Sequence, residues 1–222
     1  LDAAETATSS RPLVVYSPAT EAVRDAVADR ADSALQDVPR GTGDALRAAL
    51  DVLADAVAEI LVVSGDVPLV RADLLASLLE ARAMDHAAIS LVSVDAIDPT
   101  GLGRVVRNEG GTVERIVEDK DATDEERAIT EVNTSIYCFR RSVLAPALRR
   151  TSPENSQGEY YLTDVVQVLH EAGYPVASLV MDDPVEAVRH GGQHFSHRGL
   201  VGDIGRHDFL SIAPAAMLGR GS

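Results

Sequence analysis

The sequence predicts an α/β fold: a Rossmann-like sheet, mainly parallel, to which an antiparallel section is added. Short runs rich in valine, isoleucine and leucine alternate with runs of helical period in the first part of the chain. This alternation is typical of right-handed βαβ units. A hydrophobic content of 45% over 222 residues is also enough for a packed core.

Strands and helices alternate before residue 96. The strands are expected at 12–16, 33–36, 59–64 and 88–94, and the helices at 17–31, 43–53 and 71–83. Helical spacing is clear in the second of these helices, where apolar residues recur three and four positions apart at Leu46, Ala49, Leu50 and Leu53. Thr20 is expected to cap the first helix.

The alternation stops near residue 96, and the antiparallel section follows. Residues 96–139 predict a loop, a hairpin, an acidic turn and a long strand, and Gly110 and Gly111 form the expected hairpin turn. Two more helices, at 141–150 and 163–173, and a last strand at 175–181 follow. We therefore expect one domain over residues 1–187.

The composition argues against several classes of function. A formal net charge of −15 disfavours a nucleic-acid partner or an anionic membrane surface, because both are bound through clustered lysine and arginine. No stretch approaches the roughly 20 apolar residues of a membrane span, and no signal peptide is recognisable, so a cytoplasmic location is expected. Cys138 is the only cysteine and is expected to be a small buried hydrophobe.

Residues 188–222 differ from the rest of the chain. Four of the six histidines and seven of the sixteen glycines lie there. His190 and His194 are four residues apart, but a zinc site is disfavoured because no carboxylate lies among the first three histidines of this segment. We expect a flexible or non-native tail, and a shifted reading frame near residue 188 is one hypothesis for its origin.

Two segments with chemical potential lie at predicted strand ends. Asp66 follows the apolar strand at 59–64, where it either caps a turn or presents a carboxylate at the ligand-binding edge of the sheet and holds Mg²⁺. Gly41 and Thr42 precede the helix at 43–53, where small residues expose backbone N–H groups to an anion or a base carbonyl. An ordinary turn and cap is the alternative for that segment.

Glu118 and Asn133 lie on neighbouring predicted strands. A carboxylate and an amide placed side by side can hold sugar hydroxyls or an N-acetyl group. Two solvated polar residues on a sheet face are the alternative. The two residues alone do not decide between these interpretations.

Five segments occur together in one order: ALQDVPRGTGDAL, SGDVPL, DPTGLGRVVR, IVEDKDATDEERAITEVNTSIY and NSQGEYYLTDV. Together they resemble the uridylyltransferase domain of the bifunctional N-acetylglucosamine-1-phosphate uridyltransferase/glucosamine-1-phosphate acetyltransferase family of bacterial cell-wall synthesis. The resemblance covers about residues 2 to 187. It implies a nucleotidyltransferase version of the Rossmann-like sheet.

The resemblance implies roles for individual residues. Gln36 would read the uracil edge while Gly41 and Thr42 pack on the base, and Asp66 would be a Mg²⁺ ligand. The residues implied to hold the N-acetylglucosamine moiety are Gly103, Glu118, Asn133, Tyr161 and Thr163. The implied reaction is attack of N-acetylglucosamine 1-phosphate on the α-phosphorus of UTP, which gives UDP-N-acetylglucosamine and pyrophosphate.

The sequence also departs from the family pattern. The family begins with a strand and a Gly-rich loop followed by a lysine, whereas here the only lysine is Lys120. We therefore expect an N-terminally truncated domain whose first strand is missing, and we assign no catalytic residue. Arg189 stands where the family has an asparagine as its second metal ligand.

The missing strand leads to a structural expectation. In the family this strand lies between the strands predicted here at 12–16 and 59–64, so we expect the sheet to be most irregular around these two segments.

Two alternatives to uridylyltransferase function stay open. One is another sugar-1-phosphate nucleotidyltransferase, and the other is a non-catalytic remnant that binds sugar nucleotide or nothing.

Overall fold

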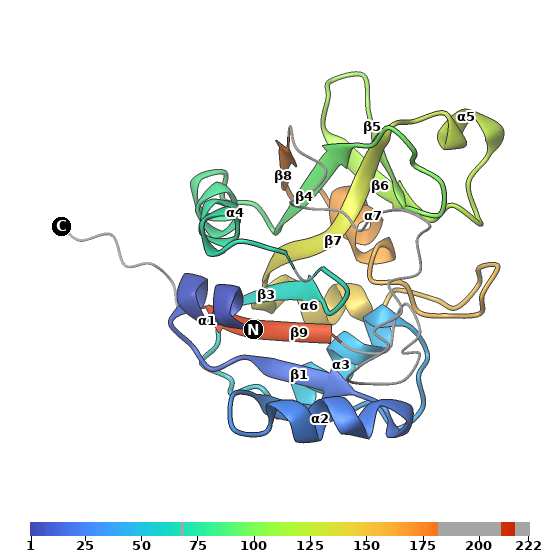
Figure 1. Ribbon diagram of the computed structural model, residues 1–222. Coiled ribbons are helices and arrows are strands. Elements are labelled where there is room, and N and C mark those ends of the chain that lie inside the picture. Colours follow the sequence, from blue (N-terminus) through green and yellow to red (C-terminus); the bar gives the residue numbers. More distant parts are fainter. Residues whose placement is uncertain (68, 182–209, 216–222) are drawn as a thin grey trace.

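The computed structural model describes residues 1–67, 69–181 and 210–215 (Figure 1). Its strands are β1 (Leu13–Tyr16), β2 (Asp32–Leu35), β3 (Glu59–Ser64), β4 (Ile89–Asp95), β5 (Arg104–Arg107), β6 (Val113–Val117), β7 (Glu131–Arg140), β8 (Val176–Met181) and β9 (Leu210–Ala215). Its helices are α1 (Asp2–Thr8), α2 (Glu21–Val27), α3 (Thr42–Val52), α4 (Ala72–Met84), α5 (Asp124–Arg127), α6 (Arg141–Leu148) and α7 (Asp164–Glu171), and the 3₁₀ turn η1 (Pro18–Thr20) precedes α2. The fold is mixed α/β, and each strand and helix predicted before residue 182 is present.

The strands form one sheet in the order β2-β1-β9-β3-β7-β4-β8, and the β5–β6 hairpin is attached through β7. β1 and β2 form a small parallel pair, and β3 to β8 form a six-stranded mixed group. β1, β2, β3, β4 and β8 share one direction, as the predicted βαβ units require. Only the β1–β2 and β4–β8 pairs are hydrogen-bonded in parallel, however, because β9 and β7 run the opposite way between their neighbours.

The long strand β7 is antiparallel to its neighbours, as the sequence predicted for this section, but it lies inside the sheet. It inserts between β3 and β4, with Leu61 opposite Cys138 on one side and Ile89 opposite Phe139 on the other. Cys138 is fully buried, as predicted, and burial raises the pKa of its thiol to about 12. The thiol is thus a core group and not a nucleophile.

The expected irregularity around 12–16 and 59–64 is wrong. β9 fills the place between β1 and β3 and pairs antiparallel with both, with Val14 opposite Ser211 and Val62 opposite Ile212. Backbone groups in the middle of a sheet need partners, and a strand from the tail supplies them. Figure 1 shows β9 between the other two strands. The remaining tail residues, including Arg189 and the four histidines, lie outside the described residues.

Helices cover both faces of the sheet. Alternate side chains of β3 separate the two cores: Ile60 and Val62 pack with α3, α6 and α7, whereas Leu61 and Val63 pack with α1 and α4. This alternation is the two-residue period of a strand buried on both sides. Among the described residues, none of the helices is long and apolar enough to cross a membrane.

Candidate active site at the strand ends

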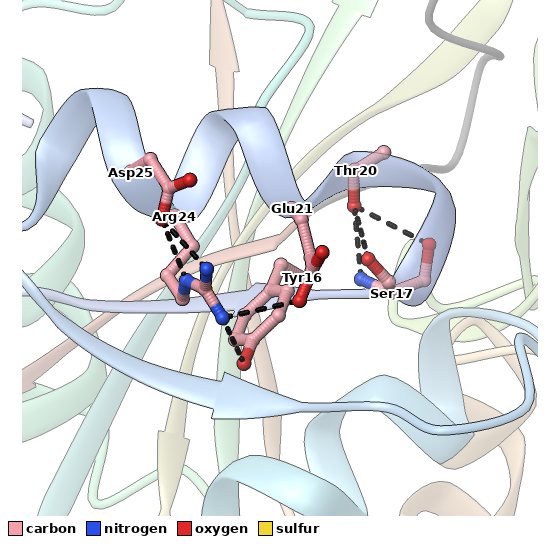
Figure 2. Close-up of polar contacts among 6 residues, drawn as sticks. All are labelled: Tyr16, Ser17, Thr20, Glu21, Arg24 and Asp25. Atoms are coloured by element: carbon pink, nitrogen blue, oxygen red, sulfur yellow. Dashed lines mark hydrogen bonds and ion pairs between the residues drawn. The ribbon is translucent and has the colours of Figure 1, made fainter.

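The β1–α2 connection, at the carboxyl end of β1, is held by its own polar contacts (Figure 2). The Ser17 backbone N–H donates to Thr20 Oγ1 at 2.9 Å within a capping box. The Arg24 guanidinium lies over the Tyr16 ring, 5.3 Å from its centroid, and donates to the Asp25 carboxylate at 2.7 Å. This capping box belongs to η1, whose N-cap is Ser17, whereas Thr20 holds the predicted N-cap position of α2 without a side-chain capping bond to that helix. Arg24 is engaged by the protein's own aromatic and acidic groups.

The next strand end carries the predicted base-binding residue Gln36. Its side chain is buried, and Nε2 donates to the Gly41 carbonyl and to Asp44 Oδ2, both at 3.1 Å. Gln36 therefore braces the loop that leads into α3. Its amide is held in place by this loop and by the first turn of the helix.

Gly41 is required by a close backbone approach. Its φ is +101°, and a Cβ atom would lie 2.6 Å from the Tyr160 carbonyl oxygen. The Gly43 N–H donates to that same oxygen at 2.8 Å, and the Leu162 N–H donates to Thr42 Oγ1 at 3.1 Å. The loop before α3 is thus bonded to the segment GEYYLTD, which lies more than a hundred residues later in the chain.

Arg47 strengthens this junction. Its guanidinium stacks on the Tyr160 ring at 4.3 Å from the centroid and donates to Thr151 Oγ1 at 3.0 Å. A stacked and hydrogen-bonded arginine holds two surfaces in one relative position. The two sequence motifs therefore form one structural unit.

Asp66 lies in the turn after β3. The Val67 N–H donates to the Ser64 carbonyl at 3.2 Å and closes this turn. A cavity of about 360 Å³ adjoins it, lined by residues that include Val14, Val63 and Gly65. Asp66 therefore lies at the carboxyl end of β3, where the sequence analysis expects it, and its role as a metal ligand stays a prediction.

One carboxylate in this turn fits a Mg²⁺ ion that is bound mainly through the phosphates of the nucleotide. No cluster of three or more histidine, cysteine, aspartate or glutamate side chains suited to a metal occurs among the described residues. Mg²⁺ is commonly bound through one or two carboxylates plus substrate phosphates. Asp66 could supply one such carboxylate, and Arg189 lies outside the described part of the chain.

Four of the residues predicted to hold the sugar form one cluster of contacts. Thr163 Oγ1 donates to Glu118 Oε1 at 3.0 Å, and the Asn133 N–H donates to the Gly103 carbonyl at 2.8 Å. A Cβ on Gly103 would lie 3.6 Å from both carboxylate oxygens of Glu118. Four segments distant in sequence thus bring Gly103, Glu118, Asn133 and Thr163 together.

A bulge in β7 orients Asn133. The register between β4 and β7 shifts between Leu91 and Ser93, and Ser135 has a φ of +61°. Asn133 Oδ1 accepts from the Ser135 N–H at 3.3 Å while its Nδ2 donates to the Tyr137 hydroxyl at 2.6 Å. A non-glycine residue with positive φ is costly, so this bulge is a position where backbone strain accompanies a candidate site.

Two acidic residues that the sequence analysis did not single out belong to the same region. Burial, followed by the charges of Glu118 and Asp121, raises the pKa of Asp164 to about 6. Asp164 begins α7 directly after Thr163, and Asp121 Oδ1 accepts from the Ser156 N–H at 2.9 Å. The acidic run after Glu118 was visible in the sequence, but its proximity to α7 depends on tertiary packing.

Tyr161 lies beside this cluster. Its side chain is buried, and its hydroxyl accepts from Gln157 Nε2 at 2.7 Å. Burial raises the pKa of this phenol, and the charges of Asp121 and Glu118 act in the same direction. Tyr161 therefore lies near Asp121 and near Glu118, the carboxylate that Thr163 and Gly103 also approach.

These contacts define the class of the protein: an α/β domain with a loop–helix junction and a cluster of buried and partly buried polar contacts. The chain belongs to the nucleotidyl transferase family, whose sequence pattern matches residues 13–213. The match reaches into β9, and the domain boundary predicted at residue 187 stays a prediction.

Its curated relatives are bifunctional GlmU proteins, as the sequence resemblance indicated. The chain is 47% identical to GlmU of Limosilactobacillus fermentum over 163 residues, which is 73% of this chain and 36% of that protein. It is 42% identical to GlmU of Corynebacterium efficiens over 169 residues, 76% and 35% of the two chains, and 37% identical to GlmU of Lactobacillus gasseri over 188 residues, 85% and 41%. The chain thus spans little more than a third of the length of these relatives.

Proposed function

We propose that this chain is a uridylyltransferase domain that binds UTP and N-acetylglucosamine 1-phosphate and is specialised for making UDP-N-acetylglucosamine for cell-wall synthesis in the cytoplasm. The observation that supports it most is the continuous set of hydrogen bonds from Thr42 through Leu162 and Thr163 to Glu118. These bonds link the loop proposed for the base to the pocket proposed for the amino sugar. A sugar nucleotide likewise has a base at one end and a sugar at the other.

In this proposal the protein contributes mainly by placement. Gly41 and Thr42 form a surface for the uracil ring, and Gln36, which also braces the loop, reads the edge of the base. The proposed sugar ligands are Gly103, Glu118, Asn133, Tyr161 and Thr163. Holding two reactants in an attacking geometry is a large part of catalysis of phosphoryl transfer.

The proposed chemical step is a substitution at phosphorus. An oxygen of the sugar 1-phosphate forms a bond to the α-phosphorus of UTP, and the bond from that phosphorus to the α–β bridging oxygen breaks. Pyrophosphate leaves with the bridging oxygen and its electron pair. Magnesium held by Asp66 and the phosphates would neutralise the charge of the triphosphate.

A second candidate is binding of the sugar nucleotide without turnover. It is favoured by the engagement of Arg24 with Tyr16 and Asp25 and of Lys120 with Gln157. Phosphoryl transfer depends on positive groups that stabilise the charge developing on the phosphates. A cation that is already engaged by the protein is less able to stabilise the charge on the phosphates, and this favours binding over catalysis.

Calorimetry with a nucleotide series tests the proposal. We expect UDP-N-acetylglucosamine and UTP to bind, and dTTP and GTP to bind at least about tenfold more weakly, because a uracil site excludes the thymine methyl group and a purine. Release of pyrophosphate distinguishes the two candidates. Equal affinity for all four nucleotides would contradict uridine specificity.

A further inference from the structure

Lys120 lies at one end of a short hydrogen-bond relay that reaches the sugar pocket. Its Nζ donates to Gln157 Oε1 at 2.7 Å, and Gln157 Nε2 donates to the Tyr161 hydroxyl at 2.7 Å. Lys120 follows β6, whereas Gln157 and Tyr161 lie in the loop before α7. The proposed function assigns no role to Lys120 or Gln157.

The chemistry of lysine fixes the direction of this relay. An ammonium group has three donors and no acceptor, so the carbonyl oxygen of Gln157 must face Lys120. The amide nitrogen then faces Tyr161, and the phenol oxygen must accept. The hydroxyl hydrogen of Tyr161 is consequently directed away from Gln157.

The loop that carries Gln157 is held at several points. Asn155 Oδ1 accepts from the Gln157 N–H at 3.2 Å and from the Glu159 N–H at 3.1 Å, and Asp121 Oδ1 accepts from the Ser156 N–H at 2.9 Å. These bonds position the backbone of residues 155–159. The orientation of the Gln157 side chain therefore depends on Lys120 and Tyr161 and not on the path of the loop.

Tyr161 is the buried end of this hydrogen-bond relay. Its side chain is buried, and its phenol is close enough to Glu118 and Asp121 for their charges to raise its pKa. Hydrogen bonds of the phenol with the side chains of Gln157 and Ser156 act the other way and lower that pKa. A buried hydroxyl needs a partner for its hydrogen as well as for its oxygen.

We propose that Lys120 and Gln157 are positioning residues that make Tyr161 a hydrogen-bond donor to an oxygen of the bound sugar. This inference rests on the proposed function, because the oxygen belongs to a sugar nucleotide, and it adds two specificity-determining positions to that site. The recognised chemistry is a neutral acceptor oxygen, either a hydroxyl or an amide carbonyl. A sugar group that can only donate would meet no acceptor at Tyr161.

Substitution Gln157→Glu keeps both hydrogen bonds but reverses the direction of the bond between residue 157 and Tyr161. The new carboxylate accepts from Lys120 and also from Tyr161, so the phenol donates to residue 157 and no longer to the sugar. We expect UDP-N-acetylglucosamine to bind about tenfold more weakly, the effect of one hydrogen bond of about 1.4 kcal/mol. Binding of UDP, which lacks the sugar, is expected to change little.

A double-mutant cycle with Tyr161→Phe separates the relay from the added charge. The charge is present with either residue at position 161, whereas the reversal needs the phenol, so Gln157→Glu is expected to have at most a small effect in the Phe background. Lys120→Met is expected to weaken sugar binding by about threefold, and Lys120→Arg to retain it because guanidinium is also a pure donor. Equal tenfold losses in both backgrounds would overturn the inference.

The direction of the hydrogen bonds from Lys120 through Gln157 to Tyr161 is tested without a ligand. In protein labelled with ¹³C at tyrosine Cζ, and with the Tyr161 signal assigned by Tyr161→Phe, we expect Gln157→Glu to raise the pKa of Tyr161 because an acceptor favours the protonated phenol. An unchanged or lower pKa would overturn the relay.

The binding measurements distinguish failure of the proposed function from failure of this inference. If the wild-type chain binds neither UDP nor UDP-N-acetylglucosamine, the proposed function fails and this inference fails with it. Normal wild-type binding with no effect of Gln157→Glu overturns the inference alone.

Discussion

The sugar side and the β1–β3 side of the candidate site are built in different ways. On the sugar side, buried polar side chains bond to one another, as in the Asn133–Tyr137 and Thr163–Glu118 pairs. On the β1–β3 side, Asp66 lies in the turn after β3, beside a cavity whose lining combines aliphatic side chains with Asp2 and Ser64. The first side already presents positioned donors and acceptors, whereas the described lining of this cavity includes no lysine or arginine for a triphosphate.

This difference separates binding from turnover. Groups held in place before the ligand arrives cost little to organise, so a preorganised pocket can bind a sugar nucleotide by itself. Transfer of a nucleotidyl group also needs charge stabilisation at the phosphates. The comparison therefore predicts that binding of the sugar nucleotide and the rate of nucleotidyl transfer respond independently to mutation.

Turnover should show the largest effect. With UTP, N-acetylglucosamine 1-phosphate and Mg²⁺ at saturation, we expect the 222-residue chain to release pyrophosphate at least about 10⁴-fold more slowly than GlmU of Limosilactobacillus fermentum. The loss of one preorganised donor costs about 10² to 10³ in rate, and the Gly-rich loop and its lysine would have supplied several. A coupled pyrophosphate assay on both proteins measures the ratio, and near-equal rates would mean that the phosphate site is misplaced.

Gly41→Ala tests whether the two motifs form one unit. The positive φ and the 2.6 Å approach of a Cβ to the Tyr160 carbonyl lead us to expect a loss of about 3 kcal/mol in the free energy of unfolding. Gly111→Ala is the matched control, because Gly111 has a φ of +80° but no atom within 4 Å of its Cβ position, and about 1 kcal/mol is expected there. Equal losses in urea denaturation would show that the close approach is unimportant.

Thr163→Val tests the pocket itself. We expect about tenfold weaker binding of UDP-N-acetylglucosamine, because Glu118 loses the donor that orients it. Thr134→Val serves as control: Thr134 is equally buried at 5% exposure, but its hydroxyl donates to the Val92 carbonyl, so it should lower stability without changing affinity. Calorimetry and thermal unfolding of both variants distinguish these outcomes, and an equal loss of affinity in the control would contradict the assignment.

The smallest expected effect is a pH dependence from Asp164. Its pKa is raised to about 6, so the folded state binds this proton more tightly than the unfolded state, and its contribution to stability is lost as pH rises from about 4 through 6. Asp164→Asn is therefore expected to stabilise the protein by about 1 kcal/mol at pH 7, after discounting for partial exposure, and not at pH 4. Asp37→Asn, on an exposed loop residue, is the control, and a pH-independent difference would show that Asp164 is not the titrating group.

The order of strands and helices could be predicted from the sequence because it depends on local patterns. The apolar period of α3 and the Gly110–Gly111 turn are signals within a few residues, and both elements are present as predicted. The insertion of β7 between β3 and β4 could not be predicted in this way. Which strands pair is decided by contacts between residues far apart in the sequence.

The strand β9 shows the same limit more clearly. Its segment, residues 210–215, contains Pro214 and follows a stretch rich in glycine and histidine, which gave no strand signal. Its place is set by the unpaired edges of β1 and β3, which require hydrogen-bond partners whatever the local propensity of the chain. Tertiary context therefore overrode the sequence pattern here.

The candidate site was predictable as a set of motifs but not as a network. The sequence indicated Glu118, Asn133 and Thr163, and the structure brings them together. The bonds of Gln36 to its own loop and of Gln157 to Tyr161 carry no sequence signature, because they depend on side-chain orientation. For the same reason the raised pKa of Asp164 could not be anticipated.

The most direct test of the account compares the affinities of UDP-N-acetylglucosamine and UDP for the wild-type chain by calorimetry. A preorganised sugar pocket predicts that the sugar nucleotide binds at least about tenfold more tightly, since several hydrogen bonds are added to those of the nucleotide. Asn133→Ala should remove most of this difference and leave UDP binding unchanged. Equal affinities of the wild-type chain for the two ligands would contradict the claim that this side of the site is ready to bind sugar.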